Sequence, residues 1–534
     1  MRIFSAEQIR AWDAYTISNE PVASVDLMER AALKVFGWIK GQGLLNKNFL
    51  VCCGKGNNGG DGLAIARMLA ENHCTVQVII AGDPEKGSAD FRENLSRLPS
   101  TITCFNLQNT SDLAALDTVF NITKTPADSE PAKTNLQPPG TLSGNTIIID
   151  AIFGSGLHKV PEGIYASLIA LINQSNMPVI SVDLPSGMFT DDPTNSESVV
   201  KATSTLGFQC YKMAYLFPSN AAQLGKLQIL DIGLHEQYAK DTAGVYQLTD
   251  EQLARTIYRP RSDHSHKGTH GHALLVAGSY GKMGAAVLAA SACLRAGAGL
   301  LTCHIPSSGY NIMQTALPEA MVVTDYNSSY NTQFDGDLSV YKTIGIGPGI
   351  GTGSETATLL SRLMTVFRRP MVIDADALNL LSRNADLLSQ LPPGSILTPH
   401  PKEFERLFGK AVDDGHRFRL AIDKSVELKC VIVLKGQHTL VATPSGKGYF
   451  NNTGNAGLAK GGTGDTLTGI ITAMLAQGYE PADAAILGVY LHGLTADLLI
   501  KENQSRESLM ASDLIAGLGK AFTALHNVSD PGLH

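Results

Sequence analysis

The feature that most constrains the fold is a recurring unit in which a short apolar run leads directly into a polar, glycine-rich loop and then a helix. Its first clear copy is FLVCC at 49–53, followed by GKGNNGGDG at 54–62 and the helical pattern LAIARMLAEN. Alternation of apolar strands with helices is typical of a parallel sheet that helices cover on both faces. The sequence therefore predicts an α/β fold, with ligands bound beyond the carboxyl ends of the strands.

Copies of this unit occur in both halves of the chain. With 534 residues, of which 44% are hydrophobic and 17% charged, the composition is that of an ordinary globular protein. This length is enough for about two to four domains. The alternation is lost between residues 232 and 263, so we predict a first domain over 1–240 and a second over 241–534.

Charge and hydropathy exclude several classes of partner. A formal net charge of −7 without a basic patch gives no reason to expect nucleic-acid binding. Residues 1–10 lack the pattern of a signal peptide, and no window approaches the ~20 apolar residues of a membrane span. The eight cysteines are scattered without CxxC pairs, which suits buried free thiols in a reducing compartment. We predict a cytoplasmic homo-oligomer that acts on small molecules, with no nucleic-acid or membrane partner.

The beginning of the chain is expected to supply packing elements. Ser5 and Gln8 have the spacing of a capping box that opens a helix, and a second helix is predicted over 25–39. A strand is predicted over 75–80. The stretch 106–145, rich in Asn, Thr, Pro and Ser, is interpreted as a surface excursion without chemistry.

Polar side chains in the first domain gather where strands end. The loop after the first strand carries Asn57, Asn58 and Asp61, more polar groups than a turn alone requires. Asp150 and Asp183 each follow an apolar run, in TIIIDAIFGSGL and PVISVDLPSG, so both should lie at carboxyl ends of strands. A single aspartate there is often only a helix cap, but two beside such a loop indicate one ligand-binding crevice.

The second domain contains NAGLAKGGTGDTLTG at 455–469, a glycine-rich loop joined to a helix start. Its glycines allow close approach to a ligand, and free amides at a helix start attract anions. Asp465 is either a helix N-cap or the base that takes a proton from a substrate hydroxyl during phosphoryl transfer. One buried helix face is predicted to follow from Leu467, Ile470, Ile471, Met474 and Leu475.

The motifs GKGNNGGDG, DAIFGSGL and VDLPSG resemble the YjeF N-terminal family of NAD(P)H-hydrate epimerases. The resemblance implies a Rossmann-like three-layer sandwich that interconverts the R and S forms of hydrated NADH and NADPH. It implies a potassium ion held by Asn58, Asp150 and Ser186, with Asp150 also the catalytic acid or base. The implied contacts of the hydrated nucleotide are Asn57, Asn58, Gly59, Gly60, Asp61, Gly154, Ser155, Gly156, Leu157, His158, Lys159, Val160 and Asp183.

The second half resembles the YjeF C-terminal family of ribokinase-like NAD(P)H-hydrate dehydratases, through ALLVAGS, TIGIGPGIG, PMVIDADAL, SILTPHPKEF, CVIVLKGQHTLVA and the loop at 455–469. This implies a ribokinase-like α/β domain that dehydrates the S form with ADP and magnesium, releasing AMP and phosphate. Asp465 would be catalytic, and the implied substrate contacts are Ala285, Gly349, His400 and Asp465. The implied adenine-nucleotide contacts are Lys435, Gly436, Gln437, His438, Thr439 and Gly464.

Two further readings of these motifs stay open at this stage. The second domain could be a vitamin-precursor kinase, which shares the glycine loop, and the first could be a non-catalytic binding module.

A metal site is suggested by four histidines close in sequence, His264, His266, His270 and His272. No acidic or cysteine partner accompanies them, and His272 is expected to flank a strand.

Overall fold

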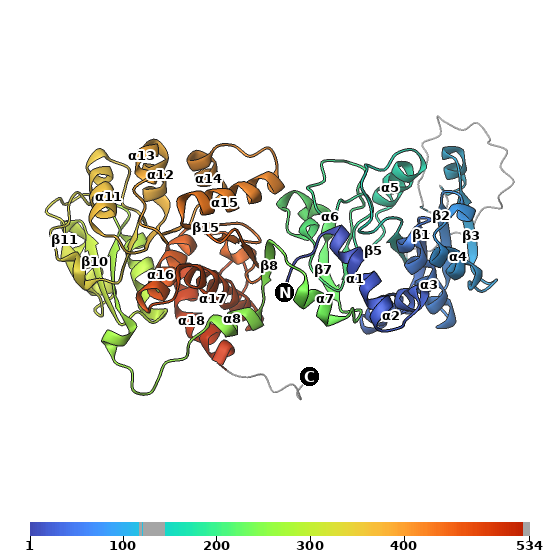
Figure 1. Cartoon of the computed structure of the whole chain (residues 1–534), viewed down its shortest axis with the longest axis horizontal. Coiled ribbons are helices and arrows are strands. Elements are labelled where there is room, and N and C mark those ends of the chain that lie inside the picture. The colour runs from blue at the N-terminus through green and yellow to red at the C-terminus, as the bar shows by residue number, and fades with distance from the viewer. Residues whose placement is uncertain (117–119, 121–144, 527–534) are drawn as a thin grey trace. The chain divides into compact units, whose positions relative to one another are not determined.

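The computed structural model describes residues 1–116, 120 and 145–526, in two compact units that are described separately (Figure 1). One unit is Arg2–Gly244; the other is Val245–His534 together with Met1. Most of the predicted surface excursion at 106–145 lies outside the described residues.

A seven-stranded parallel sheet, in the order β3-β2-β1-β4-β5-β6-β7, forms the centre of the N-terminal unit. Its strands are β1 (Asn48–Cys53), β2 (Val76–Ala81), β3 (Thr103–Leu107), β4 (Thr146–Ala151), β5 (Val179–Val182), β6 (Ser204–Phe208) and β7 (Lys226–Leu230). Its helices are α1 (Ala6–Asn19), α2 (Ser24–Gly41), α3 (Asn57–Glu71), α4 (Ala89–Ser96), α5 (Ile164–Gln174), α6 (Ala221–Leu224) and α7 (Glu236–Asp241).

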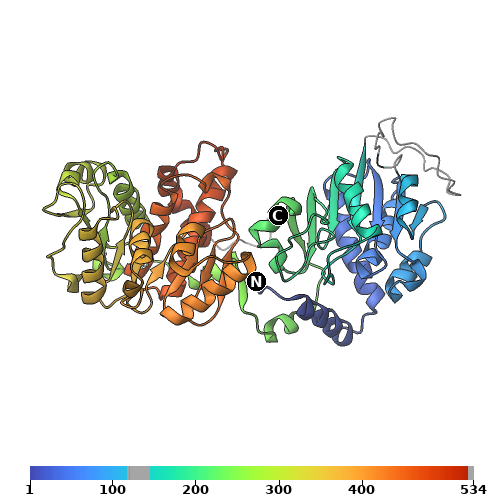
Figure 2. The same ribbon diagram turned by 90° about the horizontal axis from the view of Figure 1, so that it is seen from above.

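Helices cover both faces of this sheet, because side chains alternate between the faces along each strand. Val51 and Ile149 pack with α2, α3 and α4 on one face, whereas Leu50 and Ile148 pack with α5 on the other. Figure 2 shows the sheet between these two layers of helices. The predicted three-layer α/β sandwich is confirmed.

Local predictions for this unit need two corrections. The helix predicted after the first glycine loop begins earlier, at Asn57, so NNGGDG forms its first turns. Residues 103–107 form β3, which overlaps the predicted excursion. The capping box of Ser5 and Gln8 is confirmed at the start of α1.

The C-terminal unit has a ten-stranded sheet in the order β11-β10-β9-β12-β13-β14-β15-β16-β17-β8. The strands are β8 (Tyr246–Thr249), β9 (His272–Val276), β10 (Leu300–Ile305), β11 (Met321–Thr324), β12 (Thr343–Ile346), β13 (Met371–Ile373), β14 (Ile396–Leu397), β15 (Val431–Leu434), β16 (Leu440–Ala442) and β17 (Gly448–Asn451). Only β16 runs antiparallel to its neighbours among these strands. The predicted apolar run at 430–442 is therefore a hairpin, whose turn is Lys435–Thr439.

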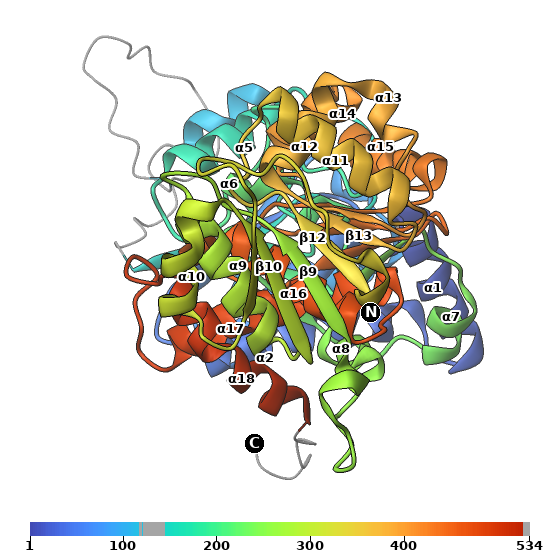
Figure 3. The same ribbon diagram turned by 90° about the vertical axis from the view of Figure 1, so that its left-hand side faces the viewer.

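Helices also cover both faces of the second sheet (Figure 3). One face carries α11 (Ser354–Val366), α12 (Ala375–Arg383), α14 (Pro401–Phe408) and α15 (Asp414–Leu428). The other carries α9 (Met283–Arg295), α16 (Thr463–Ala476) and α17 (Pro481–Lys501), with α18 (Ala511–His526) packed outside them. The smaller helices are α8 (Glu251–Ile257), α10 (Tyr310–Ala316) and α13 (Ala385–Leu388). This is the ribokinase-like α/β arrangement that the sequence predicted.

Two helices of this unit differ from expectation because they lie in the core. α16 is buried on almost all sides, whereas the sequence predicted one buried face. It packs so closely on α9 that a Cβ at Gly469 would lie 2.1 Å from the Ala289 carbonyl oxygen. α17 is long and apolar enough to cross a membrane, with a mean hydropathy of 1.4, so the prediction that no window approaches a span was wrong. Since 61% of that window is buried within the unit, α17 is accounted for as a core helix.

The cysteines are free thiols, as predicted. Seven are buried, but Cys104 on the edge strand β3 is exposed.

Candidate active sites

In the N-terminal unit, Asp183 lies directly after β5 and forms a buried ion pair. Its Oδ1 is 2.8 Å from Lys212 Nζ, and its Oδ2 accepts a hydrogen bond of 3.1 Å from the Ser155 amide. Tyr215 donates its hydroxyl to the Asp183 carbonyl, at 2.6 Å. The backbone of Asp183 is left-handed, with φ of 66°, a strained conformation for a non-glycine residue. Strain of this kind clusters at functional sites. The hydrogen bond from the Ser155 amide connects this strained residue to the predicted loop 154–160.

Two more carboxyl groups lie near this pair. Burial, and then the neighbouring charges of Asp183 and Asp13, raise the pKa of Asp61 well above its usual range. Burial and Asp183 also raise the pKa of Asp13 to about 6, although Lys212 acts in the opposite direction. Lys212 therefore pairs with Asp183 and also acts on Asp13. Asp13 and Lys212 were missed by sequence reasoning, because neither follows a strand that ends in a motif.

Asp150 is completely buried, and both of its oxygens accept hydrogen bonds. Oδ2 accepts bonds of 2.8 Å from the Ser181 hydroxyl and from the Ser186 amide, and Oδ1 accepts one of 2.5 Å from the Ser186 hydroxyl. Burial raises the pKa of Asp150, against the effect of these bonds. A buried carboxyl group held by these donors is poorly placed to exchange protons with a ligand. The geometry thus argues against the predicted acid–base role of Asp150.

The three predicted ion ligands converge on the turn after β4. A Cβ at Gly154 would lie 3.1 Å from Asn58 Oδ1, and the adjacent Phe153 amide donates to Ser186 Oγ at 2.8 Å. Asn58 Nδ2 is buried and has no hydrogen-bond partner among the described residues. Amide, carboxylate and hydroxyl oxygens are hard donors, which suit a hard cation. The residues present therefore fit the implied ion.

The other predicted nucleotide contacts of this unit differ in their exposure. Gly59 and Gly60 are buried by protein: a Cβ at Gly59 would lie 1.7 Å from the Gly54 carbonyl oxygen. Leu157 is half-buried, while Asn57 and the remaining loop residues are exposed, namely Gly156, His158, Lys159 and Val160.

In the C-terminal unit the corresponding ion pair joins Asp374 and Lys435. The distance from Lys435 Nζ to Asp374 Oδ1 is 2.9 Å, and the Thr468 hydroxyl donates to Asp374 Oδ2 at 2.6 Å. Burial acts to raise the pKa of Asp374, but Lys435 and Thr468 bring it below its usual range. The next residue, Ala375, is left-handed with φ of 49°. Asp374 was missed as a site residue, although in the sequence it follows an apolar run just as Asp150 and Asp183 do.

Asp465 lies in the first turn of α16, beside this pair. The N-cap is Gly462, so the interpretation of Asp465 as a mere N-cap is wrong. Burial, and then the negative charge of Asp374, raise the pKa of Asp465 to about 6, while Lys435 acts to lower it. Asp465 is thus a carboxyl group able to gain and lose a proton near neutral pH.

A cavity of about 810 Å³ opens next to these groups. Its lining includes most of the predicted adenine-nucleotide contacts, which are Lys435, Gly436, Gln437, Thr439 and Gly464. His438 is not among the lining residues; burial lowers its pKa.

His492 on α17 is a lining residue that the sequence did not reveal. Burial lowers its pKa to about 4, and its Nε2 has no hydrogen-bond partner within the described part of the chain. A neutral imidazole therefore belongs to the wall of the cavity.

The predicted substrate contacts of this unit come from three elements. A Cβ at Gly349 would lie 3.1 Å from Ala285 Cβ, so these two residues are neighbours. His400 caps α14, its Nδ1 accepting bonds from the Lys402 and Glu403 amides, and its side chain is 45% exposed.

The four histidines of 264–272 have separate local roles. His264 and His266 are exposed, and His266 caps a short turn. His272 begins β9, where its Nε2 is 2.9 Å from Thr302 Oγ1. In the described residues, no group of three or more His, Cys, Asp or Glu side chains is arranged to hold a metal ion.

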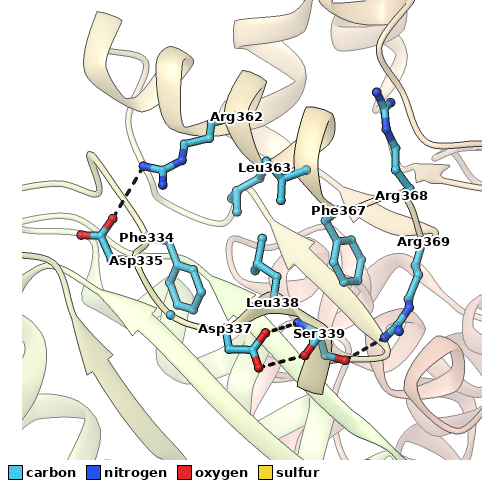
Figure 4. Close-up of a pocket in the computed structure, with 12 residues that line it drawn as sticks. Phe334, Asp335, Asp337, Leu338, Ser339, Arg362, Leu363, Phe367, Arg368 and Arg369 are labelled. Atoms are coloured by element: carbon cyan, nitrogen blue, oxygen red, sulfur yellow. Dashed lines mark hydrogen bonds and ion pairs between the residues drawn. The ribbon is translucent and has the colours of Figure 1, made fainter.

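A second hollow, of about 570 Å³, lies beside α11 (Figure 4). Its polar groups bond to one another: Arg362 is 3.6 Å from Asp335, and Arg369 donates to the Ser339 carbonyl at 3.2 Å. It contains none of the predicted site residues.

Two α/β units, each with a lysine–aspartate pair at a strand end and one with a nucleotide-sized cavity, define the class: a two-domain enzyme that handles nucleotides. The family model described as YjeF-related protein N-terminus matches residues 24–214, and the model described as NAD(P)H-hydrate dehydratase matches 273–518. The chain belongs to the family of bifunctional NAD(P)H-hydrate repair enzymes.

Similarity to individual relatives extends over nearly the whole chain. The bifunctional NAD(P)H-hydrate repair enzyme of Moorella thermoacetica is 33% identical, over 96% of this chain and 95% of its own length. The enzyme of the same name from Vibrio cholerae is 34% identical, over 96% of this chain and 97% of its own length. A solved structure of an ADP/ATP-dependent NAD(P)H-hydrate dehydratase from Bacillus subtilis, crystallised with ATP and magnesium, is 35% identical; it covers 52% of this chain and 98% of its own, with a TM-score of 0.46. The two family models and the full-length relatives support the repair-enzyme interpretation and neither the vitamin-kinase nor the binding-module alternative.

Proposed function

We propose that the chain repairs hydrated NADH and NADPH at two sites. The N-terminal site interconverts the R and S epimers, and the C-terminal site dehydrates the S epimer with ADP, releasing AMP and phosphate. The observation that carries this proposal is Asp465, a carboxyl group of raised pKa beside Lys435 and the cavity of nucleotide size. Membership of the repair-enzyme family supports the choice of substrate.

Dehydration follows from phosphorylation of the substrate hydroxyl. Asp465 accepts the hydroxyl proton while the oxygen attacks the β-phosphorus of ADP, and AMP leaves. The C–O bond of the new phosphate ester then breaks, and phosphate leaves with the bonding electrons. The lone pair of the adjacent ring nitrogen assists this step. Loss of a proton from the neighbouring ring carbon restores the reduced nicotinamide. Lys435 and the amides at the start of α16 would stabilise the charge on the transferred group.

Epimerisation needs a proton donor for the same hydroxyl. We infer that Asp61 supplies it, because burial and the charge of Asp183 raise its pKa well above its usual range and, unlike Asp150, it has no hydrogen bond in the described structure. The C–O bond breaks with help from the nitrogen lone pair, and the proton of Asp61 converts the departing hydroxide to water. Water then adds to the opposite face and returns a proton to Asp61.

Two ions belong to the proposal. Asn58, Asp150 and Ser186 would hold potassium, which would fix the turn at 153–155 against the substrate site; the hard oxygen donors that converge on this turn support this. Magnesium would accompany the phosphates of ADP, where it neutralises charge.

The decisive experiment incubates the chain with a mixture of both epimers of hydrated NADH and follows the absorbance of reduced nicotinamide. With ADP present, we expect the whole mixture to be converted, with one AMP and one free phosphate formed for each NADH. Accumulation of a stable phosphorylated product without free phosphate would instead identify a kinase.

A further inference from the structure

A third hollow of the C-terminal unit, of about 650 Å³, opens between α12 and α14. Its lining is almost entirely polar and consists of Thr352, Asp376, Asn379, Ser382, Arg383 and Arg406. We propose that this hollow is an anion subsite in which Arg383 and Arg406 bind a phosphate group of the dinucleotide substrate. The inference rests on the function proposed above.

The two guanidinium groups have donors to spare. Arg383 donates to the Thr352 carbonyl at 3.2 Å, and Arg406 donates to Asn379 Oδ1 at 2.7 Å. Neither forms an ion pair within the residues that the structure describes. A guanidinium carries five N–H donors, and its fork matches the oxygens of a phosphate. Most of this donor capacity therefore remains available in the hollow.

The one carboxylate of the lining does not neutralise these arginines, because it is engaged elsewhere. Asp376 Oδ2 accepts a bond of 2.9 Å from the Gly351 amide and one of 3.3 Å from Lys282 Nζ. In the hollow of Figure 4, by comparison, Arg362 lies 3.6 Å from the carboxylate of Asp335. Both arginines are exposed and have no counter-ion among the described residues, so they are open to an anion supplied by the ligand.

Asp376 also connects this hollow to the substrate site. Lys282, which it binds, packs against Gly349: a Cβ at Gly349 would lie 3.0 Å from the Lys282 carbonyl oxygen. On the other side, the charge of Asp376 contributes to the raised pKa of Asp465, after burial and Asp374. Asp376 thus links the lining of the hollow to Lys282, the neighbour of Gly349 at the predicted substrate site.

The anion can be the pyrophosphate, present in both hydrated cofactors, or the 2′-phosphate, present only in hydrated NADPH. To distinguish them, Arg383→Gln, Arg406→Gln and the double variant are assayed for dehydration of each hydrated cofactor. Loss of one charged hydrogen bond should raise KM by about 10- to 100-fold, with kcat and the KM for ADP unchanged. A rise with both substrates assigns the pyrophosphate, and a rise with hydrated NADPH alone assigns the 2′-phosphate. Arg383→Lys should recover part of the loss, and Arg362→Gln, in the hollow of Figure 4, should behave as the parent.

A binding measurement separates this proposal from the proposed function. The affinities of NADH and NADPH for the parent and the double variant are measured by calorimetry, which requires no turnover. Failure of the parent to dehydrate either substrate would refute the function, while weaker binding of dinucleotide to the double variant would still support the subsite. Unchanged KM values and unchanged dinucleotide affinity in the double variant would overturn it.

Discussion

Each of the two units has an ion pair between a lysine and an aspartate that directly follows a strand. Asp183 after β5 pairs with Lys212 at 2.8 Å, and Asp374 after β13 pairs with Lys435 at 2.9 Å. In each unit a further carboxyl group of raised pKa lies next to the pair, Asp61 in the first and Asp465 in the second. In both, the paired aspartate supplies negative charge that helps its neighbour to hold a proton.

The lysines differ in what they can reach. The Lys212 side chain is 1% exposed, whereas that of Lys435 is 23% exposed and lines the 810 Å³ cavity. We infer that Lys212 only positions Asp183, whereas Lys435 can also contact a phosphate. This matches one-substrate epimerisation in the first unit and phosphoryl transfer in the second.

The glycine loops of the two units also differ in how much space they leave for a ligand. A Cβ at Gly59 would collide with the Gly54 carbonyl oxygen, at 1.7 Å, whereas at Gly464 the nearest atom would be Lys435 Nζ at 3.6 Å. The fold itself requires the first glycine, while the second keeps space open for a ligand.

The largest expected effect comes from Asp465→Asn. Removal of a general base should lower the kcat of dehydration by about 10²–10⁴, while epimerisation is unchanged. The control is Asp483→Asn, in the first turn of α17, which should retain activity. A dehydration rate within a few-fold of the parent would remove the base from the mechanism.

Next in size is the effect of Lys212→Met on stability. Loss of one partner from a buried pair leaves an uncompensated charge and typically costs about 3–5 kcal/mol. Lys435→Met should destabilise its unit less, because Lys435 is partly exposed, but should weaken ADP binding. Urea unfolding of the N-terminal unit measures the first effect; an unaltered transition in Lys212→Met would show that the pair does not stabilise the fold.

A smaller effect is expected in the pH profile of dehydration. A base must be deprotonated, so kcat should fall as the pH drops below about 6, the pKa of Asp465. Asp374→Asn removes a negative charge that raises this pKa, so the acidic limb should move to lower pH. A limb that stays in place would show that Asp374 does not act on Asp465.

The smallest effect is predicted for Gly464→Ala. The fold has room for the methyl group, and alanine favours a helix, so stability should be kept or slightly increased. ADP should nevertheless bind several-fold more weakly, whereas Gly461→Ala, where a Cβ meets nothing within 4 Å, should bind ADP normally. Equal ADP affinities for the two variants would contradict a ligand role for Gly464.

Strand ends were the most informative sequence signal. The rule that an aspartate after an apolar run lies in a crevice identified Asp150 and Asp183, and it applies equally to Asp374 in PMVIDADAL. It could not show that Asp150 is sealed by Ser181 and Ser186, because this depends on how β4 and β5 pair.

Other features depended on tertiary contacts that no local pattern encodes. Glycine is a poor helix former, so NNGGDG was interpreted as loop, yet the packing of Gly59 on Gly54 holds it in helix. Lys212 and Asp13 come from segments without a motif, and only the fold brings them to Asp183.

The most direct test of the central claim, two independent sites on one chain, is complementation between Asp61→Asn and Asp465→Asn. With mixed epimers and ADP, Asp61→Asn alone should convert only the S epimer plus whatever epimerises spontaneously, and Asp465→Asn alone should form almost no NADH. Mixed together, the two folded variants should convert all of the substrate at close to the parent rate. Failure of the mixture to consume the R epimer faster than Asp61→Asn alone would contradict the account.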